Sequence, residues 1–179
     1  GELWGYHTLP LSIAKAIITL ADEHNWFLST TVGDIRYWRK DLTFRVDVIP
    51  RDVKMVNSNI EALIDEPVRI LARNPEAIEA IQNLCQTQFA GQCRTEIFYN
   101  SDGTAESLMV VAIGADKGSA LQLVLSRLEI DPAQVLAIGD NGNDVPMFKV
   151  AGTAVAMANA LNPIKLEANI IAPDNDHDG

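Results

Sequence analysis

Two patterns of apolar positions divide the chain. Before Gly114, helical periodicity and β-rich stretches are separated by turn residues, and after Gly114 short, wholly apolar stretches alternate with helical ones. The first pattern is typical of an α+β unit with hairpins. The second predicts a parallel sheet covered on both faces, because strands buried on both sides are apolar throughout. We therefore expect an α/β chain of two units, residues 1–113 and 114–179.

Caps and turn residues mark the elements expected in residues 1–113. Pro10 precedes a helical pattern, and Asn74-Pro75-Glu76 combines a capping side chain, a first-turn proline and an early acid, which predicts a second helix. The stretch Asn100–Thr104 has the chemistry of a hairpin turn. The segment Ile35–Arg51 is hard to interpret, and we expect a strand near Phe44–Ile49. The other strands are expected at Trp26–Thr31, Val68–Ala72, Thr95–Tyr99 and Ser107–Ala112, with a short helix at Asn57–Ile64.

Beyond Gly114, helices and strands are expected to alternate. In chain order the expected ranges are Lys117–Leu128, Val135–Ile138, Asp144–Val150, Thr153–Met157, Asn162–Ala168 and Ile170–Ile171. Ligands of open α/β sheets bind at the carboxyl ends of the strands. The loop after Ile138 is therefore a place to look for chemistry.

That loop carries the sharpest chemical signal. It contains Asp140, Asn143 and Asp144, at the point where an expected strand gives way to an expected helix. Two carboxylates with an amide between them form a hard, all-oxygen site that suits Mg²⁺. An ordinary polar turn uses the same residue types, so the loop taken alone leaves both interpretations open.

A second signal lies at Asp116–Leu121. Lys117 opens an expected helix, where the macrodipole already favours an anion. Gly118 would let a phosphate group approach the backbone. A surface lysine near a helix start is the plainer interpretation when this segment is taken alone.

The amino-acid composition argues against some classes of binding partner. The formal net charge is −10, so the mean field of the chain repels nucleic acid and anionic membranes, and a phosphate site would need local positive charge. No apolar run approaches membrane-spanning length. Cys85 and Cys93 form no metal-ligand pattern and are expected to be reduced thiols in a cytoplasmic protein.

The two signals and their spacing together resemble motifs three and four of the haloacid dehalogenase superfamily, in its Cof-like branch with an inserted α/β cap (subclass IIB). The resemblance implies a Rossmann-like parallel core in residues 114–179 and a cap domain in residues 1–113. It rests on these residues: Lys117-Gly118, Ala120-Leu121, Gly139-Asp140, Asn143-Asp144, Met147, Ala156-Met157, Asn159-Ala160, Lys165, Ala168 and Asp178-Gly179.

The resemblance implies a Mg²⁺-dependent phosphatase that acts on a small phosphorylated metabolite. In such enzymes one aspartate attacks phosphorus and forms an aspartyl-phosphate, and a second aspartate two positions later is the general acid and base. By motif match, Asp140 would bind Mg²⁺ directly, and Asp144 would bind it directly, through water, or as a support. Lys117 would hold the phosphoryl oxygens. Asn143 would bond the phosphate or fix the loop, and Asn159 is a loop residue near the site.

The family's nucleophile motif is an apolar strand followed by Asp-x-Asp and usually Gly, and we expect it to be absent from these residues. The single Asp-Gly-Thr, at Asp102–Thr104, has Asn100 where the first aspartate would stand, and it lies at hairpin-turn spacing. No Ser or Thr is a candidate for the second motif. We therefore expect that these residues are a piece of a longer protein whose missing N-terminal segment supplies the nucleophile, and that this chain alone is inactive. Without that segment, Val135–Ile138 would expose an apolar edge.

Two alternatives from another class stay open. The stretch Asp174–Gly179 matches the first six positions of a calcium loop, which would make the chain a non-catalytic calcium- or magnesium-binding module, although the segment before it is not a helix. The other alternative is a metabolite-binding module with an aromatic pocket. Its candidate lining residues, which in most proteins are simply core, are Trp26, Phe27, Tyr37 and Trp38.

Overall fold

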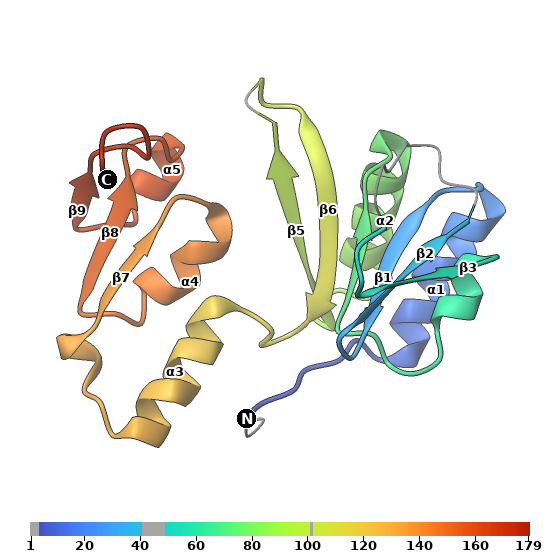
Figure 1. Cartoon of the computed structure of the whole chain (residues 1–179), viewed down its shortest axis with the longest axis horizontal. Helices are drawn as coiled ribbons and strands as arrows, with labels where there is room; N and C mark the ends of the chain where they lie inside the picture. Colours follow the sequence, from blue (N-terminus) through green and yellow to red (C-terminus); the bar gives the residue numbers. More distant parts are fainter. Residues whose placement is uncertain (1–3, 41–48, 101) are drawn as a thin grey trace. The chain divides into compact units, whose positions relative to one another are not determined.

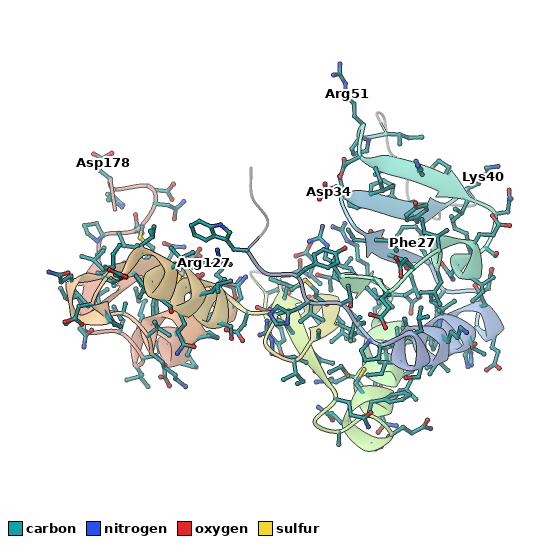
Figure 2. The ribbon with its side chains drawn as sticks, turned by 90° about the horizontal axis from the view of Figure 1, so that it is seen from below. Phe27, Asp34, Lys40, Arg51, Arg127 and Asp178 are labelled. Atoms are coloured by element: carbon teal, nitrogen blue, oxygen red, sulfur yellow. The ribbon has the colours of Figure 1, made fainter. Side chains whose placement is uncertain are left out.

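The computed structural model describes residues 4–40, 49–100 and 102–179. Within these ranges the chain forms two compact units (Figure 1). The N-terminal unit is Tyr6–Ile113, and the C-terminal unit is Gly114–Gly179 joined by Trp4 and Gly5. Trp4 packs in the C-terminal unit because its ring lies 5.4 Å from the guanidinium of Arg127, which Figure 2 labels.

The N-terminal unit is built on a six-stranded sheet in the order β3-β2-β1-β4-β6-β5. Neighbouring strands are antiparallel except β2 and β3, which run parallel. The strands are β1 (Leu28–Val32), β2 (Ile35–Arg39), β3 (Val53–Val56), β4 (Arg69–Ala72), β5 (Cys93–Tyr99) and β6 (Ala105–Ala112).

Two long helices pack on one face of this sheet, α1 (Leu11–Glu23) and α2 (Pro75–Thr87) (Figure 1). The start of α2 is fixed as expected, because the Asn74 side chain accepts a hydrogen bond from the amide of Ala77 at 3.1 Å. A short 3₁₀ helix, η1 (Asn59–Ala62), stands where a short helix was expected. The apolar sides of both long helices and of the central strands form one buried cluster.

Two strands of this unit, β2 and β3, were not foreseen. The segment that was hard to interpret forms β2, in which Arg39 is 6% exposed and donates to the carbonyl of Asn25 at 3.3 Å. A buried arginine disguises the apolar period of a strand, which is why the pattern did not reveal it. The strand expected near Phe44–Ile49 lies, apart from Ile49, outside the described residues.

The C-terminal unit contains a three-stranded parallel sheet, as expected. The strand order is β7-β8-β9, so the polar loops that follow β7 and β8 lie at the same edge. The α/β fold class is thereby confirmed. The elements are α3 (Lys117–Leu128), η2 (Pro132–Gln134), β7 (Leu136–Gly139), η3 (Gly142–Asp144), α4 (Val145–Phe148), β8 (Thr153–Met157), α5 (Asn162–Lys165) and β9 (Ile170–Ala172).

The expectation that both faces of this sheet are covered is wrong. The small residues of β7 and β8 pack against Phe148 of α4, but on the opposite face Leu136, Ile138 and Ile170 are 56%, 52% and 51% exposed. Strand β7 lies at the sheet edge and is apolar there, as expected. Helices α4 and α5 are also shorter than their patterns suggested, since each ends in a tighter turn after four residues.

None of the helices that the structure describes combines the length and the apolar character needed to cross a bilayer. Cys85 and Cys93 are free, as expected. Burial raises the pKa of the Cys85 thiol to about 12, so this group stays protonated and unreactive near neutral pH.

Candidate active site

The candidate site lies at the carboxyl edge of the parallel sheet in the C-terminal unit. Asp140 follows β7 directly, and Asn159 follows β8, whose register with β7 pairs Gly139 with Ala156. The carboxyl ends of adjacent parallel strands meet at one edge, so the two side chains approach each other. The amide of Asn159 donates to Asp140 Oδ2 at 3.4 Å.

The buried carboxylate of Asp144 fixes the conformation of the loop. Its side chain is only 4% exposed, and its Oδ2 accepts hydrogen bonds from the backbone amides of Asp140 at 2.9 Å and Asn141 at 3.0 Å. Asn141 and Asp144 together form a capping box at the start of η3. The backbone of Asp140 is therefore held in place by the carboxylate four residues later. Sequence reasoning did not single out Asn141, although its position just before a turn of helix is a signal for a cap.

Lys117 brings a positive charge to this loop from the start of α3. Its ammonium forms an ion pair with Asp144 Oδ1 and lies 3.4 Å from Asn143 Oδ1. The Lys117 side chain is 51% exposed, so one side of the ammonium is held by the loop and the other faces solvent. Hydrogen bonds thus bring together all five residues expected at the site: Lys117, Asp140, Asn143, Asp144 and Asn159.

Two glycines allow this close approach. A Cβ at Gly139 would overlap the carboxyl group of Asp144, and a Cβ at Gly118 would lie 2.5 Å from the backbone oxygen of Pro146. The expectation for Gly118 was that it admits a phosphate group. The structure gives it another reason: α3 packs directly on the backbone of α4, and this contact places Lys117 beside Asp144.

Burial and hydrogen bonding oppose each other at Asp144. Burial alone would raise the pKa of its carboxyl group, but the hydrogen bond from Lys117 and those from the Asn141 and Asp140 amides lower it. The net effect is a lowered pKa, so Asp144 is a carboxylate near neutral pH. Its negative charge holds the lysine at the edge of the site.

Asp140 is the open carboxylate of the site. Its side chain is exposed, and the bond from Asn159 is the single hydrogen bond of that side chain within the described part of the chain. Both oxygens of Asp144, in contrast, are already engaged. Among residues 4–40, 49–100 and 102–179 no group of three or more His, Cys, Asp or Glu side chains is placed to hold a metal ion. Mg²⁺ is commonly bound by one or two carboxylates plus water and substrate phosphate, so this donor set fits that ion.

Residues of the turn after β9 contact one another. Asp174 Oδ1 accepts a hydrogen bond from the amide of Asp176 at 3.1 Å and lies 2.5 Å from His177 Nδ1. Figure 2 shows Asp178 on this turn, and the element before it is a strand. The geometry therefore gives the calcium-loop alternative no support. The turn also contains the Asp-x-Asp spacing of the nucleophile motif, at Asp174/Asp176 and Asp176/Asp178 after the apolar strand β9, so the expectation that these residues lack that spacing is wrong.

The four aromatic residues considered for a ligand pocket divide into two pairs. Trp26 and Tyr37 are 8% and 6% exposed and belong to the core of the N-terminal unit. Phe27 and Trp38 line a pocket on that unit.

The carboxyl edge of the parallel sheet carries a lysine and two carboxylates. Such a set of side chains can bind an anion together with a cation. Residues 1–179 match the haloacid dehalogenase-like hydrolase family, and the chain belongs to that family. The family resemblance carried by the Lys117 and Asp140 motifs is thereby confirmed.

Individual relatives match parts of the chain. The chain is 44% identical over 64 residues, 36% of its length, to a phosphoglycolate phosphatase of Methanopyrus kandleri, and the match covers 28% of that protein. It is 35% identical over 75 residues, 42% of its length, to a chloroplastic protein of Arabidopsis thaliana named endoribonuclease YBEY, with 13% of that protein covered. The matches thus span less than a third of either relative.

Solved structures show the same fold. A HAD subclass IIB sugar phosphatase superposes with a TM-score of 0.79 and 20% identity, over 99% of this chain and 66% of that one. At this identity the likeness concerns the fold.

Proposed function

We propose that this chain carries the metal- and phosphate-binding part of a Mg²⁺-dependent phosphatase that hydrolyses small phosphate esters. The observation that carries the proposal is the joint placement of Lys117, Asp140 and Asp144 at one sheet edge. We further propose that residues 114–179 are part of the hydrolase core and that residues 1–113 are its cap.

Each residue has a distinct proposed role. Mg²⁺ bound there would offset the charge between a phosphoryl group and an attacking carboxylate. Asp140, as the open carboxylate, would be its direct protein ligand. Asp144 would position Asp140 and Lys117, because both of its oxygens are already bonded to the loop and the lysine. The free side of the Lys117 ammonium would bind phosphoryl oxygens, and Asn143 and Asn159 would orient them.

The attacking group is proposed to lie outside these 179 residues. An aspartate oxygen would attack phosphorus, the ester oxygen would leave with a proton from a second aspartate, and water would then hydrolyse the aspartyl-phosphate. The support for an external nucleophile is that Asp102 stands in a β5–β6 hairpin turn, where its carboxylate bonds Thr104. The rival source within the chain is the Asp174–Asp178 turn.

The substrate class follows from the relatives. Two of them are named for phosphoglycolate and for sugar phosphates, so we propose a small phosphorylated metabolite. The free thiols of Cys85 and Cys93 accord with a reaction in the cytoplasm, where thiols stay reduced.

The test is hydrolysis of 4-nitrophenyl phosphate with and without Mg²⁺. The 179-residue chain should give no Mg²⁺-dependent turnover, and the protein that also contains the preceding segment should give turnover that Asp140→Asn abolishes. Asp131→Asn is the matched control, because Asp131 is an exposed carboxylate that caps η2 in the same unit. Its turnover should equal that of the parent protein.

Two outcomes would contradict parts of this proposal. Turnover by the 179-residue chain that is lost in Asp174→Asn or Asp176→Asn would place the nucleophile in the turn after β9. Full activity of Asp140→Asn in the longer protein would remove the assignment of the metal site.

A further inference from the structure

A pocket of about 170 Å³ lies on the N-terminal unit, remote in sequence from the candidate active site. Its walls come from β1, β2 and β4 and from the residues that flank them. Two of its residues are aromatic and three are arginines: Phe27, Trp38, Arg36, Arg69 and Arg73. Figure 2 labels Phe27, which precedes β1.

Strand register explains why these side chains share one face. Trp38 on β2 and Leu71 on β4 both pair with Ser29 of β1, and Arg36 and Arg69 both pair with Thr31. Side chains alternate along a strand, so the residues between them point to the opposite face, where Leu28, Ile70 and Ala72 join the core under the helices. The pocket therefore opens on the face of the sheet that α1 and α2 leave free.

The aromatic part of the pocket is held in place. Trp38 Nε1 donates to Ser29 Oγ at 2.8 Å, and the ring of Phe27 meets Trp38 edge-on with centroids 6.2 Å apart. The guanidinium of Arg36 lies 5.4 Å from the centroid of the Trp38 ring and bonds Asp52 twice, at 2.6 and 2.8 Å. Arg36 and Trp38 thus form a fixed wall with its charge already balanced.

The other two arginines of the pocket are Arg69 and Arg73. Arg69 donates to Thr31 Oγ1 at 3.2 Å, and neither Arg69 nor Arg73 pairs with a carboxylate in the part of the chain that the structure describes. Arg73 has no carboxylate partner there, and Arg69 interacts electrostatically only with Asp52, which is already bonded twice to Arg36, so the pocket carries net positive charge in a chain whose net charge is −10. Side chains of this kind bind oxyanions through forked hydrogen bonds.

We propose that this arginine–tryptophan pocket binds a small organic phosphate or phosphonate in which the dianionic group is attached to a flat ring. Arg69 and Arg73 bind the dianion, and the ring packs against Trp38 and Phe27. The size agrees, because an apolar cavity of about 150 Å³ holds one benzene ring. The proposal goes beyond the proposed hydrolysis, and its test measures binding rather than turnover.

The probe is phenylphosphonate, whose carbon–phosphorus bond resists ester hydrolysis. Titration of the 179-residue chain, followed by two-dimensional NMR, should shift the indole signal of Trp38 and the amides of β1, β2 and β4 in a saturable way. The double variant Arg69→Gln/Arg73→Gln should weaken binding by about tenfold or more, because two charge-assisted bonds are lost. Its unfolding midpoint should match that of the parent chain.

The matched control is Lys15→Gln/Lys54→Gln, which removes the same charge elsewhere on the unit. Lys54 pairs with Tyr37 and so lies on the other face of the sheet, and Lys15 lies on α1. Binding by this control should equal that of the parent chain. Inorganic phosphate, which lacks the ring, and benzoate, which carries one charge, should each bind at least about tenfold more weakly than phenylphosphonate.

Three results would overturn the proposal. The first is an absence of saturable shifts at Trp38, or shifts confined to Lys117 and Asp140. The second is equal weakening in the arginine and lysine double variants, which would reduce the effect to net charge. The third is equal binding of phenylphosphonate and either comparison anion.

Discussion

The two units are stabilised in different ways. Among the described residues, the main cluster of the N-terminal unit has sixteen buried members contributed by two helices and a sheet, whereas the cluster of the C-terminal unit has four, three of them alanines. Large apolar side chains of the C-terminal unit stay exposed, with Ile138 at 52% and Leu166 at 86%. Burial of apolar surface therefore stabilises the first unit far more than the second.

Local polar contacts take a larger share in the C-terminal unit. Asp144 bonds two backbone amides and Lys117, and Gly118 and Gly139 let backbone and carboxylate approach closely. These contacts also position the candidate active site. The candidate active site thus lies in the less deeply buried unit, as is common where function and packing compete.

The largest effect is expected in the core of the N-terminal unit. Ile17 is fully buried between α1 and the sheet, so Ile17→Ala should lower the free energy of unfolding by about 2–5 kcal/mol through lost burial and a cavity. Leu166→Ala, at an exposed position, should change it by no more than about 0.5 kcal/mol. Urea titration with hydrogen exchange resolved by peptide separates the two units. Equal losses in both variants would break the contrast between the units.

A medium effect is expected at the close contact inside the site. Gly139→Ala should destabilise the C-terminal unit by about 1–3 kcal/mol, because the added methyl group would displace the Asp144 carboxyl. Gly142→Ala is the matched control, since the nearest atom to its Cβ would be a methyl group of Ile164 at 4.0 Å. The same exchange measurement should show no loss in the control. A Gly139→Ala protein as stable as Gly142→Ala would show that the loop relaxes freely.

Much of the fold could be predicted because local signals agreed with tertiary structure. The start of α2 follows from Asn74 and Pro75, and α3 occupies the predicted range without change. Strand β2 was missed because Arg39 is buried through a bond to a carbonyl rather than by being apolar. The prediction that the second face of the parallel sheet is covered was wrong. A wholly apolar strand can be buried on both faces, but its sequence does not show that a packing partner is present.

The residues of the candidate site could be predicted from the sequence, but their contacts could not. The motifs that contain Lys117, Asp140 and Asp144, with their spacing, indicated these residues, and the family resemblance suggested their roles. No pattern could show that Asp144 is fully engaged and Asp140 open, because that depends on the backbone of Asp140 and Asn141. The packing role of Gly118 likewise depends on a contact with Pro146 that lies far away in the sequence.

The smallest expected effect is the loss of folding stability at acid pH. It tests the electrostatic difference between the two units. Each unit has an ion pair that lowers a carboxyl pKa: the hydrogen bond from Arg36 lowers that of Asp52, and at Asp144 the bonds from Lys117 and two amides outweigh burial. A lowered folded-state pKa adds stability above the unfolded value of about 3.9, and this stability is lost as pH falls through the folded value. Both contributions should therefore disappear below about pH 4.

The two pairs should differ in size and in salt dependence. The Asp144 side chain is 4% exposed and that of Asp52 47%, so salt screens the Asp52 pair more strongly. Asp144→Asn should flatten the acid dependence of the C-terminal unit in high and low salt, whereas Asp52→Asn should alter the N-terminal unit only in low salt. Urea midpoints of each unit between about pH 3 and 6 measure this. An unchanged acid dependence in Asp144→Asn would show that its bonds to the loop contribute nothing to stability, and the site would then be held by packing alone.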